Sequence, residues 1–430
     1  MSYHRFQVFN HDFIVRKEYC PLRELGKGAY GVVCAAENVE RGQRVAIKKL
    51  IHLFDRQIFT KRALREIKLL QHFSGHKNII NLIDMEIIDY KRYNEIYLYT
   101  NLMDADLHAI IRSGQSLTEA HYQTFIHQIL AGLKYIHSAN VLHRDLKPGN
   151  IFVNANCELR IGDFGLARNC VDKPDDEDSG FMTEYVATRW YRAPEIMLSF
   201  RSYTKAIDIW SVGCIFAELL GGRTLFKGRD YVDQLNQILG VLGKPDDETI
   251  ARVGSNRVRN YLKGLPNTQK VPFARIYPKA DLKAIDLLDS LLAFDPSKRI
   301  TVQQALEHPY LAPFHFEEDE PSHHEIFDFS FEATNDMNEM KEMIANEVRK
   351  FRNQRNSLRL DVTGVRRENP ISPSDSQDHP TPASATSYTD PVDGKFDAME
   401  QEESIASAVV QTSAIPMDED LERELSGISP

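Results

Sequence analysis

The chain has 430 residues, of which 42% are apolar and 27% charged, as is typical of a soluble globular protein with two or three domain-sized units. Its net charge of −10 comes mostly from residues 353–430, which hold 15 acidic and 6 basic residues. We therefore expect no nonspecific binding to nucleic acid or to an anionic membrane. No apolar run reaches the roughly 18 residues of a membrane span, and the first residues lack a signal-peptide pattern.

The five cysteines are scattered along the chain and include no CxxC pair. Their odd number and their spacing argue against a zinc site and against a disulfide framework. We therefore expect a reducing compartment and predict a cytoplasmic and nuclear location.

Residues 1–18 are predicted to form an N-terminal extension. Apolar residues alternate at Phe6 and Val8 and again at Phe13 and Val15, a period typical of β-strands. We expect a strand or hairpin packed on the first domain, and we assign it no function.

A glycine-rich stretch follows at residues 25–33. Its glycines would let the backbone close over a polyphosphate, because no Cβ stands in the way. The GxGxxG spacing also fits a dinucleotide-binding fold, but that fold needs a helix directly after the last glycine. Residues 32–36 continue as a strand instead, so we expect a strand hairpin that grips the nucleotide. The residues predicted to bind it here are Leu25, Gly26, Lys27, Gly28, Ala29, Tyr30, Gly31, Val32 and Val33.

The next strand and helix predict a pair of opposite charges. Alternation in Val45–Lys48 makes Lys48 a plausible phosphate ligand, with Ala46 beside the nucleotide, and Glu66 lies in a helical stretch from which it would orient Lys48. Taken alone, Lys48 and Glu66 would be two solvated surface charges. The motifs farther along the chain favour the pair.

A hinge is predicted at residues 101–103, between a strand-rich first lobe (19–102) and a helical second lobe (103–311). Met103 would contact the nucleotide, and Asp106 is placed to reach a ribose hydroxyl. An aspartate after a hinge is equally suited to cap a helix. The helix predicted next, at residues 119–138, is amphipathic and should belong to the core.

Residues 143–150 read His-Arg-Asp-Leu-Lys-Pro-Gly-Asn, and Asp-Phe-Gly follows at 163–165. Asp145 would accept the proton of an acceptor hydroxyl or orient it, and Lys147 would neutralise charge on the transferred phosphoryl group. Asn150 and Asp163 would supply oxygen ligands to magnesium. An isolated Asp-x-x-x-x-Asn is more often a turn, but the flanking His-Arg and Asp-Phe-Gly argue against that interpretation here.

With these motifs in order, residues 19–311 resemble a eukaryotic protein kinase. The resemblance implies an α+β, bilobal fold with a β-rich N-lobe and a mostly helical C-lobe, an ATP-dependent activity and a need for Mg²⁺. Lys147, two residues after Asp145, resembles the serine/threonine class. The sequence TEYVATRWYRAPE at 183–195 is similar to that of the mitogen-activated protein kinase family. Together with AIDIWS at 206–211 and LAFDP at 292–296, it most resembles the fungal cell-wall-integrity branch, although extracellular-signal-regulated kinases share Thr-Glu-Tyr.

This resemblance implies activation by an upstream dual-specificity kinase that phosphorylates Thr183 and Tyr185. Each phosphate would add a charge of about −1.5 to −2. Without the family, both would be ordinary loop residues. The resemblance also implies cationic partners for the phosphates: Arg65, Arg144 and Arg168 for phospho-Thr183, and Arg189 and Arg192 for phospho-Tyr185.

The acidic run Glu317, Glu318, Asp319 and Glu320 lies where the family has a docking site for basic peptides. The implied partners are substrates with Ser/Thr-Pro sites, transcription factors among them, as well as activators and phosphatases. A run of acids is otherwise more often a solvated surface. Phe316 stands where relatives usually have aspartate. By the same resemblance, Asp208 would support the catalytic loop, and Arg299 would pair with Glu195. We expect a monomer.

Residues 312–352 are predicted to form a C-terminal extension that ends in a helix over 335–351, because Met340, Ile344, Val348 and Phe351 recur at helical spacing. Residues 353–430 are rich in Ser, Pro and acidic residues and are predicted to be a disordered tail.

Two other interpretations stay open at this point. A cyclin-dependent kinase would lack the Thr-x-Tyr pair, and a catalytically idle docking scaffold would usually lack one of Lys48, Asp145, Asn150 and Asp163.

Overall fold

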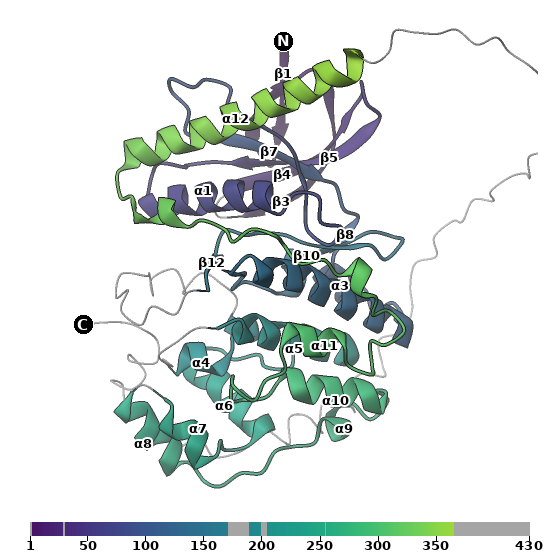
Figure 1. The fold of residues 1–430 in the computed structure, drawn as a ribbon, viewed down its shortest axis with the longest axis vertical. Helices are drawn as coiled ribbons and strands as arrows, with labels where there is room; N and C mark the ends of the chain where they lie inside the picture. The colour runs from purple at the N-terminus through teal and green to yellow at the C-terminus, as the bar shows by residue number, and fades with distance from the viewer. Residues whose placement is uncertain (1, 29–30, 171–188, 199–203, 254, 365–430) are drawn as a thin grey trace, which may run out of the picture.

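The computed structural model describes residues 2–28, 31–170, 189–198, 204–253 and 255–364. The chain folds into two lobes stacked along its long axis, one rich in strands and the other in helices (Figure 1). The predicted α+β, bilobal fold is therefore confirmed.

The N-lobe is built on an antiparallel five-stranded sheet with the strand order β3-β4-β5-β7-β6. In β5, Val45 and Ile47 are fully buried in the core, while Ala46 and Lys48 point to the opposite face. The strands are β3 (Tyr19–Gly28), β4 (Gly31–Asn38), β5 (Gln43–Leu50), β6 (Leu82–Glu86) and β7 (Ile96–Asn101), and helix α1 (Gln57–His72) lies between β5 and β6 in the chain.

The N-terminal extension forms the expected hairpin, with β1 (Tyr3–Val8) antiparallel to β2 (His11–Arg16). Phe9 and Asn10 form its turn with φ values of +45° and +63°, the backbone that a tight two-residue hairpin turn requires. Phe13 is fully buried against Tyr97 of β7, so the hairpin extends the hydrophobic core of the N-lobe.

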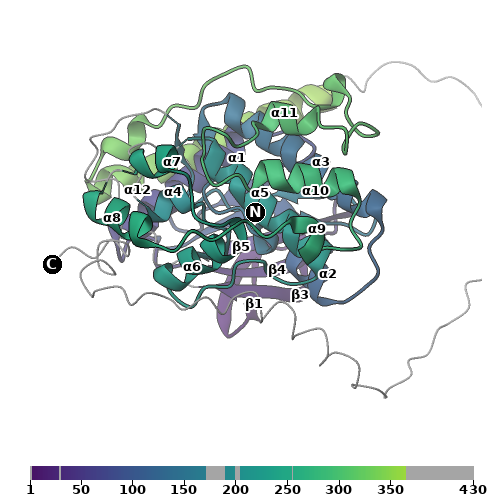
Figure 2. The same cartoon turned by 90° about the horizontal axis from the view of Figure 1, so that it is seen from below.

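Two long helices form the centre of the C-lobe: α3 (Glu119–Ser138), with the predicted bounds, and α5 (Ala206–Gly221). Seen from below, the C-lobe helices lie in front of the N-lobe sheet, part of which is visible beyond their edge (Figure 2). The other elements are β8 (Ala105–Asp106), α2 (Leu107–Arg112), β9 (Val141–Leu142), η1 (Pro148–Asn150), β10 (Ile151–Val153), β11 (Leu159–Ile161), β12 (Arg168–Asn169), η3 (Arg189–Tyr191), α4 (Pro194–Met197), α6 (Tyr231–Leu242), α7 (Asp247–Ala251), α8 (Asn256–Gly264), α9 (Phe273–Ile276), α10 (Leu282–Leu291) and α11 (Val302–Leu306). No helix in the described part of the chain is long and apolar enough to cross a membrane.

The C-terminal extension returns from the C-lobe to the N-lobe through η4 (Glu317–Asp319) and η5 (Ser330–Ala333) and ends in α12 (Met337–Gly364). Figure 1 shows α12 running across the N-lobe beside α1. Met340, Ile344 and Val348 of α12 are fully buried, as their spacing predicts.

The predicted end of this helix was wrong. The helix continues to Gly364, past the expected start of a disordered tail at residue 353. Just past Phe351 the helix makes two ion pairs: Arg352 contacts Glu86 at 3.1 Å, and Arg355 contacts Asp84, both on β6. The rest of the predicted tail, residues 365–430, lies outside the described residues.

Candidate active site

The predicted charge pair joins β5 to α1. Lys48 Nζ lies 2.6 Å from Glu66 Oε1, and Glu66 is buried while the side chain of Lys48 is 28% exposed. Burial disfavours the charge on Lys48, but Glu66 and Asp163 outweigh this effect and raise the pKa of Lys48. Lys48 therefore stays positively charged, with Glu66 in direct contact and the charge of Asp163 acting on it.

The glycine-rich stretch is the expected hairpin. Strands β3 and β4 pair antiparallel as far as Gly28 and Gly31, so a strand rather than a helix follows the last glycine, and the dinucleotide-binding alternative is excluded. A Cβ atom added to Gly26 or Gly28 would meet nothing within 4 Å, which leaves open space beside the hairpin. A Cβ at Gly31 would lie 2.7 Å from the Lys49 carbonyl oxygen, so the close approach of β5 requires glycine there.

The side chains of this hairpin divide between its two faces. Leu25 and Val33 are half-buried on the same side as Ala46, while Lys27 is exposed. Val32 was predicted to bind the nucleotide, but its side chain is fully buried in the N-lobe core on the opposite face, because successive strand residues alternate. Ala29 and Tyr30 lie outside the described residues.

At the hinge, Met103 is 8% exposed and packs into the main core. Asp106 caps α2: its Oδ1 accepts a hydrogen bond of 2.7 Å from the amide of Ala109. The helix-cap alternative is therefore realised, and contact of Asp106 with a ribose stays a prediction.

The catalytic loop brings its three predicted residues together. Lys147 Nζ donates to Asp145 Oδ2 at 2.8 Å, and Asn150 Nδ2 donates to the same oxygen at 2.9 Å and to the Asp145 carbonyl at 2.8 Å. The Asp145 carboxylate thus has one defined orientation. Because both of these Asn150 bonds use its nitrogen, its amide oxygen is the atom left for a metal ion.

A buried aspartate holds this loop from below. Asp208 of α5 is fully buried and accepts hydrogen bonds from the amides of His143 (2.9 Å) and Arg144 (2.8 Å), while His137 Nε2 lies 2.9 Å away. Arg144 has a φ of +67°, which turns two successive N–H groups toward one anion. Burial raises the pKa of Asp208, but the hydrogen bond and charge of His137 outweigh it and lower that pKa. The predicted structural role of Asp208 is confirmed.

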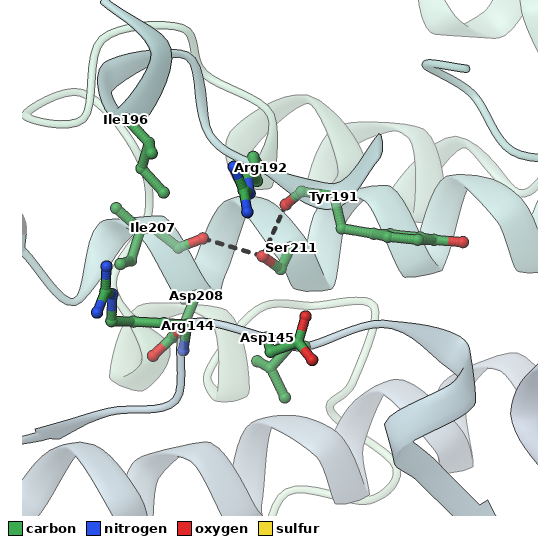
Figure 3. A pocket seen from close by; sticks show the side chains of 9 residues that line it. Arg144, Asp145, Tyr191, Arg192, Ile196, Ile207, Asp208 and Ser211 are labelled. Atoms are coloured by element: carbon green, nitrogen blue, oxygen red, sulfur yellow. Dashed lines mark hydrogen bonds between the residues drawn. The ribbon is translucent and has the colours of Figure 1, made fainter. Parts of the chain in front are cut away.

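Figure 3 shows this region from close by, with Arg144 and Asp145 facing the turn at Tyr191 and Arg192 across a small cavity. The cavity measures about 10 Å³, about the size needed for one water molecule. On its other side, Ser211 of α5 donates to the carbonyls of Tyr191 (2.8 Å) and Ile207 (3.2 Å). The catalytic loop is therefore packed closely against α5 and the turn at Tyr191 and Arg192.

The Asp163 loop is the second oxygen-rich element. Asp163 has a φ of +62°, and the Gly165 amide donates to its Oδ1 at 3.3 Å. Asp163 is exposed, yet the protein atoms around it partly desolvate its carboxyl group, which raises its pKa. The positive charges of Lys48 and Lys147 outweigh this effect, so the pKa of Asp163 is lowered. An ionised carboxylate and the amide oxygen of Asn150 are hard oxygen ligands of the kind that Mg²⁺ prefers.

The first set of predicted phosphate-binding arginines does gather. Burial, together with the charges of Arg65 and Arg144, lowers the pKa of Arg168 to about 9. No pattern in the sequence, however, indicated that Arg65 would bind Glu332 of the C-terminal extension, at 2.6 Å and 2.9 Å. Thr183, the predicted phosphorylation site for this cluster, lies outside the described residues.

The second set, Arg189 and Arg192, meets at Tyr231. Their guanidinium carbons lie 5.7 Å and 5.6 Å from the centre of its ring, and Arg192 also donates to its hydroxyl. Tyr185, the predicted partner, is again outside the described residues. Nearby, the predicted pair of Glu195 and Arg299 is present and fully buried, with distances of 2.6 Å and 2.9 Å.

The acidic docking run requires a correction. Glu317, Glu318 and Asp319 are exposed, but Glu320 is only 1% exposed and lies 2.9 Å from both His127 and His315. The turn of η4 directs Glu320 inward, so this residue anchors the segment instead of facing a partner.

Two neighbours change the character of that surface. Lys77 lies 3.2 Å from Asp319 and partly neutralises it, and Phe316 is 59% exposed beside the acids. The exposed part of the predicted docking run therefore consists of Glu317, Glu318 and Asp319, with the ring of Phe316 beside them.

We compared the chain with known protein families and proteins. The protein kinase domain matches residues 19–311. Mitogen-activated protein kinase mpkA of Aspergillus fumigatus is 64% identical over 348 residues, which are 81% of this chain and 82% of that protein. Mitogen-activated protein kinase MPS1 of Pyricularia oryzae is 63% identical over 81% of this chain and 83% of its own length. Mitogen-activated protein kinase SLT2/MPK1 of Saccharomyces cerevisiae is 59% identical over 81% and 73%.

The site geometry and these relatives lead to one assignment. Kinases of this family use ATP and Mg²⁺, are controlled by upstream kinases and phosphatases and act on protein substrates. The chain is an ATP-dependent protein serine/threonine kinase and belongs to the mitogen-activated protein kinase family.

Proposed function

We propose that this kinase phosphorylates Ser/Thr-Pro sites in a fungal cell-wall-integrity or stress-signalling cascade, after an upstream dual-specificity kinase has phosphorylated Thr183 and Tyr185. The observation that supports the activity best is the joint placement of Asp145, Lys147 and Asn150 within hydrogen-bond distance of one another. The assignment to the pathway is supported by the resemblance of residues 183–195 and 206–211 to that branch.

In this proposal the protein acts by positioning and by neutralising charge. Magnesium-bound ATP supplies the phosphoryl group. Asp145 orients the acceptor hydroxyl and takes its proton, while Lys147 neutralises charge on the transferred group. Lys48, fixed by Glu66, binds the phosphates, and Asn150 and Asp163 hold the metal through oxygen atoms. Asp106, in addition to its role as a helix cap, contacts the ribose.

The exposed acids Glu317, Glu318 and Asp319 bind basic docking peptides of the upstream kinase, of substrates such as transcription factors and of phosphatases. Charge complementarity supports this role, since three acidic side chains are exposed on one turn. The enzyme works in the cytoplasm and the nucleus.

Phosphate transfer to a pair of peptides that differ only in Ser-Pro versus Ser-Ala tests the specificity. We expect transfer to Ser-Pro after treatment with a dual-specificity kinase, and loss of that activation with Thr183→Ala or Tyr185→Phe. Asp145→Asn should lower kcat about 10²- to 10⁴-fold. Equal rates on the two peptides would refute the proline preference, and full activity of the untreated protein would refute the switch.

The pathway is tested separately. A Saccharomyces cerevisiae strain that lacks SLT2/MPK1 would be given this chain or its Asp145→Asn variant and grown on an agent that damages the cell wall. Growth with the intact chain alone is the expected result. Failure of a well-expressed, active chain would refute the pathway and leave the enzymatic activity standing.

A further inference from the structure

We propose that Glu332, in the C-terminal extension, is a positioning residue for phosphoryl transfer. Through Arg65 it holds helix α1 and the Asp163 loop in one fixed arrangement. The residue lies outside the matched kinase domain, 267 residues after Arg65.

The contact itself is strong. Arg65 Nε donates to Glu332 Oε1 at 2.6 Å, and NH2 donates to Oε2 at 2.9 Å. Paired parallel bonds between guanidinium and carboxylate are among the strongest hydrogen bonds in proteins. The side chain of Arg65 is only 2% exposed and that of Glu332 is 22% exposed, so the charge of Arg65 depends on this partner for compensation.

Arg65 transmits this contact to the active site. Its remaining nitrogen, NH1, donates to the carbonyl of Gly165, in the loop that presents Asp163. The next residue on α1 is Glu66, which binds Lys48. A shift of Arg65 would therefore move both the residue that fixes Lys48 and the loop of a predicted metal ligand.

Glu332 is itself rigidly placed. Its amide donates to the Phe329 carbonyl at 2.9 Å, and its own carbonyl accepts a bond of 2.8 Å from Lys61 of α1. The flanking Phe331 is 7% exposed and belongs to the main core. The carboxylate is thus held ready for Arg65, which reduces the entropy cost of the contact.

Glu332 also compensates a concentration of positive charge. The charges of Arg65, Arg144 and Arg62 lower the pKa of Arg168, and the charge of Glu332, which binds Arg65 directly, raises it. If this carboxylate is neutralised, repulsion among the guanidinium groups should push Arg65 away from Gly165.

Another glutamate of the C-terminal extension offers a matched control. Glu347 of α12 binds Lys68 at 2.5 Å and Gln71 at 3.1 Å, and its side chain is 17% exposed. This contact joins the same two parts of the chain, but the described bonds of Lys68 and Gln71 lead to the extension and to α1 itself, not to the Lys48 and Asp163 site.

The test compares Glu332→Gln, Glu332→Asp and Glu347→Gln in the full-length kinase. Because phospho-Thr183 would share Arg65 with Glu332, the kinetics with ATP are measured on the unphosphorylated and on the doubly phosphorylated protein, and the effect of Glu332 is expected in both. We expect a larger decrease in Tm for Glu332→Gln than for Glu347→Gln, because Arg65 is more deeply buried than Lys68. Glu332→Gln should lower kcat/KM for ATP by at least about tenfold, because small misplacements at a reacting centre are costly. Glu347→Gln should stay within about twofold. The KM for the protein substrate should not change, because Glu332 acts on the nucleotide side of the site.

Glu332→Asp keeps the charge but is too short for both bonds, so an intermediate loss of several-fold is expected. Equal kcat/KM for Glu332→Gln and Glu347→Gln would overturn the proposal. If Glu332→Gln does not fold, Glu332→Asp decides, and wild-type kinetics in that variant would overturn the proposal equally.

Discussion

The two halves of the active site are held in different ways. The catalytic loop rests on Asp208, which is fully buried and contacts residues 64 to 71 positions away within the kinase domain. Helix α1 is held by Glu332 and Glu347, which are partly exposed and lie 267 and 279 positions from their partners. The comparison teaches that the catalytic loop is supported from within the kinase domain, whereas helix α1, which carries Glu66, is also held by a segment outside it.

Replacing Asp208 should have the largest effect. Asp208→Ala leaves two buried amides and His137 without an acceptor, so we expect a loss of about 3–5 kcal/mol in the free energy of unfolding, together with loss of kinase activity. Ser211→Ala, on the same helix, should cost only about 1 kcal/mol. Urea unfolding of the full chain measures both values. If the two variants prove equally stable, the loop does not depend on Asp208.

Acid should loosen the α1 side before the catalytic loop. His72, at the end of α1, stacks on His323 of the extension at 4.0 Å, and burial together with His323 lowers the pKa of His72 to about 4. In the unfolded state the pKa of His72 is near 6.5. Protonation of His72 below that pH therefore favours the unfolded state. Stability is complete above pH 6.5 and falls as the pH drops toward 4.

The expected loss from His72 is about 2 kcal/mol, after discounting for its partial exposure. This loss of stability on acidification should be absent in His72→Gln. It should be as large in His108→Gln as in the wild type, since His108 is exposed. The contacts of Asp208 should persist through this range, because their stabilisation is lost only as the pH falls below 3.8 toward the lowered pKa of Asp208. Urea unfolding at several pH values between 7 and 4.5 tests this, and parallel curves for wild type and His72→Gln would contradict it.

Removing Arg355 should weaken the attachment of α12 to β6, with a smaller loss in the free energy of unfolding than the changes above. Arg355→Ala deprives the buried Asp84 of one cation but leaves Arg16 in contact with it. We expect a cost of about 1–2 kcal/mol by thermal or urea unfolding. Arg349→Ala, also on α12, breaks an exposed pair with Glu342 and should cost less than about 1 kcal/mol. A smaller cost for Arg355→Ala than for Arg349→Ala would show that α12 is not held through Asp84.

The smallest effect concerns the proposed docking surface at Glu317, Glu318 and Asp319, which are exposed. Lys77→Ala frees Asp319, so a short Arg/Lys-rich peptide should bind about two- to fivefold more tightly at low salt. The gain should shrink at 300 mM salt, and Lys350→Ala on α12 should show little change. Fluorescence anisotropy of the labelled peptide provides the measurement. Unchanged affinity for Lys77→Ala would place the peptide elsewhere.

The sequence was sufficient for contacts that follow from local pattern and recognisable motifs. Strand alternation and a helical stretch placed Lys48 and Glu66 correctly, and the spacing in residues 143–150 placed Asp145, Lys147 and Asn150. It was insufficient where tertiary structure decides the direction of a side chain. An acidic run gave no sign that Glu320 turns inward, and the glycine-rich motif did not show that the side chain of Val32, predicted to bind the nucleotide, lies in the N-lobe core.

The extension shows the limit most clearly. The apolar spacing predicted α12 as far as residue 351, but the helix continues past it, and Arg352 and Arg355 there meet Glu86 and Asp84 on a distant strand. Likewise, no local periodicity links Glu332 to Arg65. Such pairs become visible only when the path of the chain is known.

The attachment of α1 by the C-terminal extension also bears on how the chain is made. The ribosome completes Glu332 only 267 residues after Arg65, which at about 5–20 residues per second takes about 13–53 s. During that interval Arg65, Asp84 and Glu86 of the nascent N-lobe lack the partners that the C-terminal extension later supplies. The half of the active site that is translated first must therefore be the last to mature.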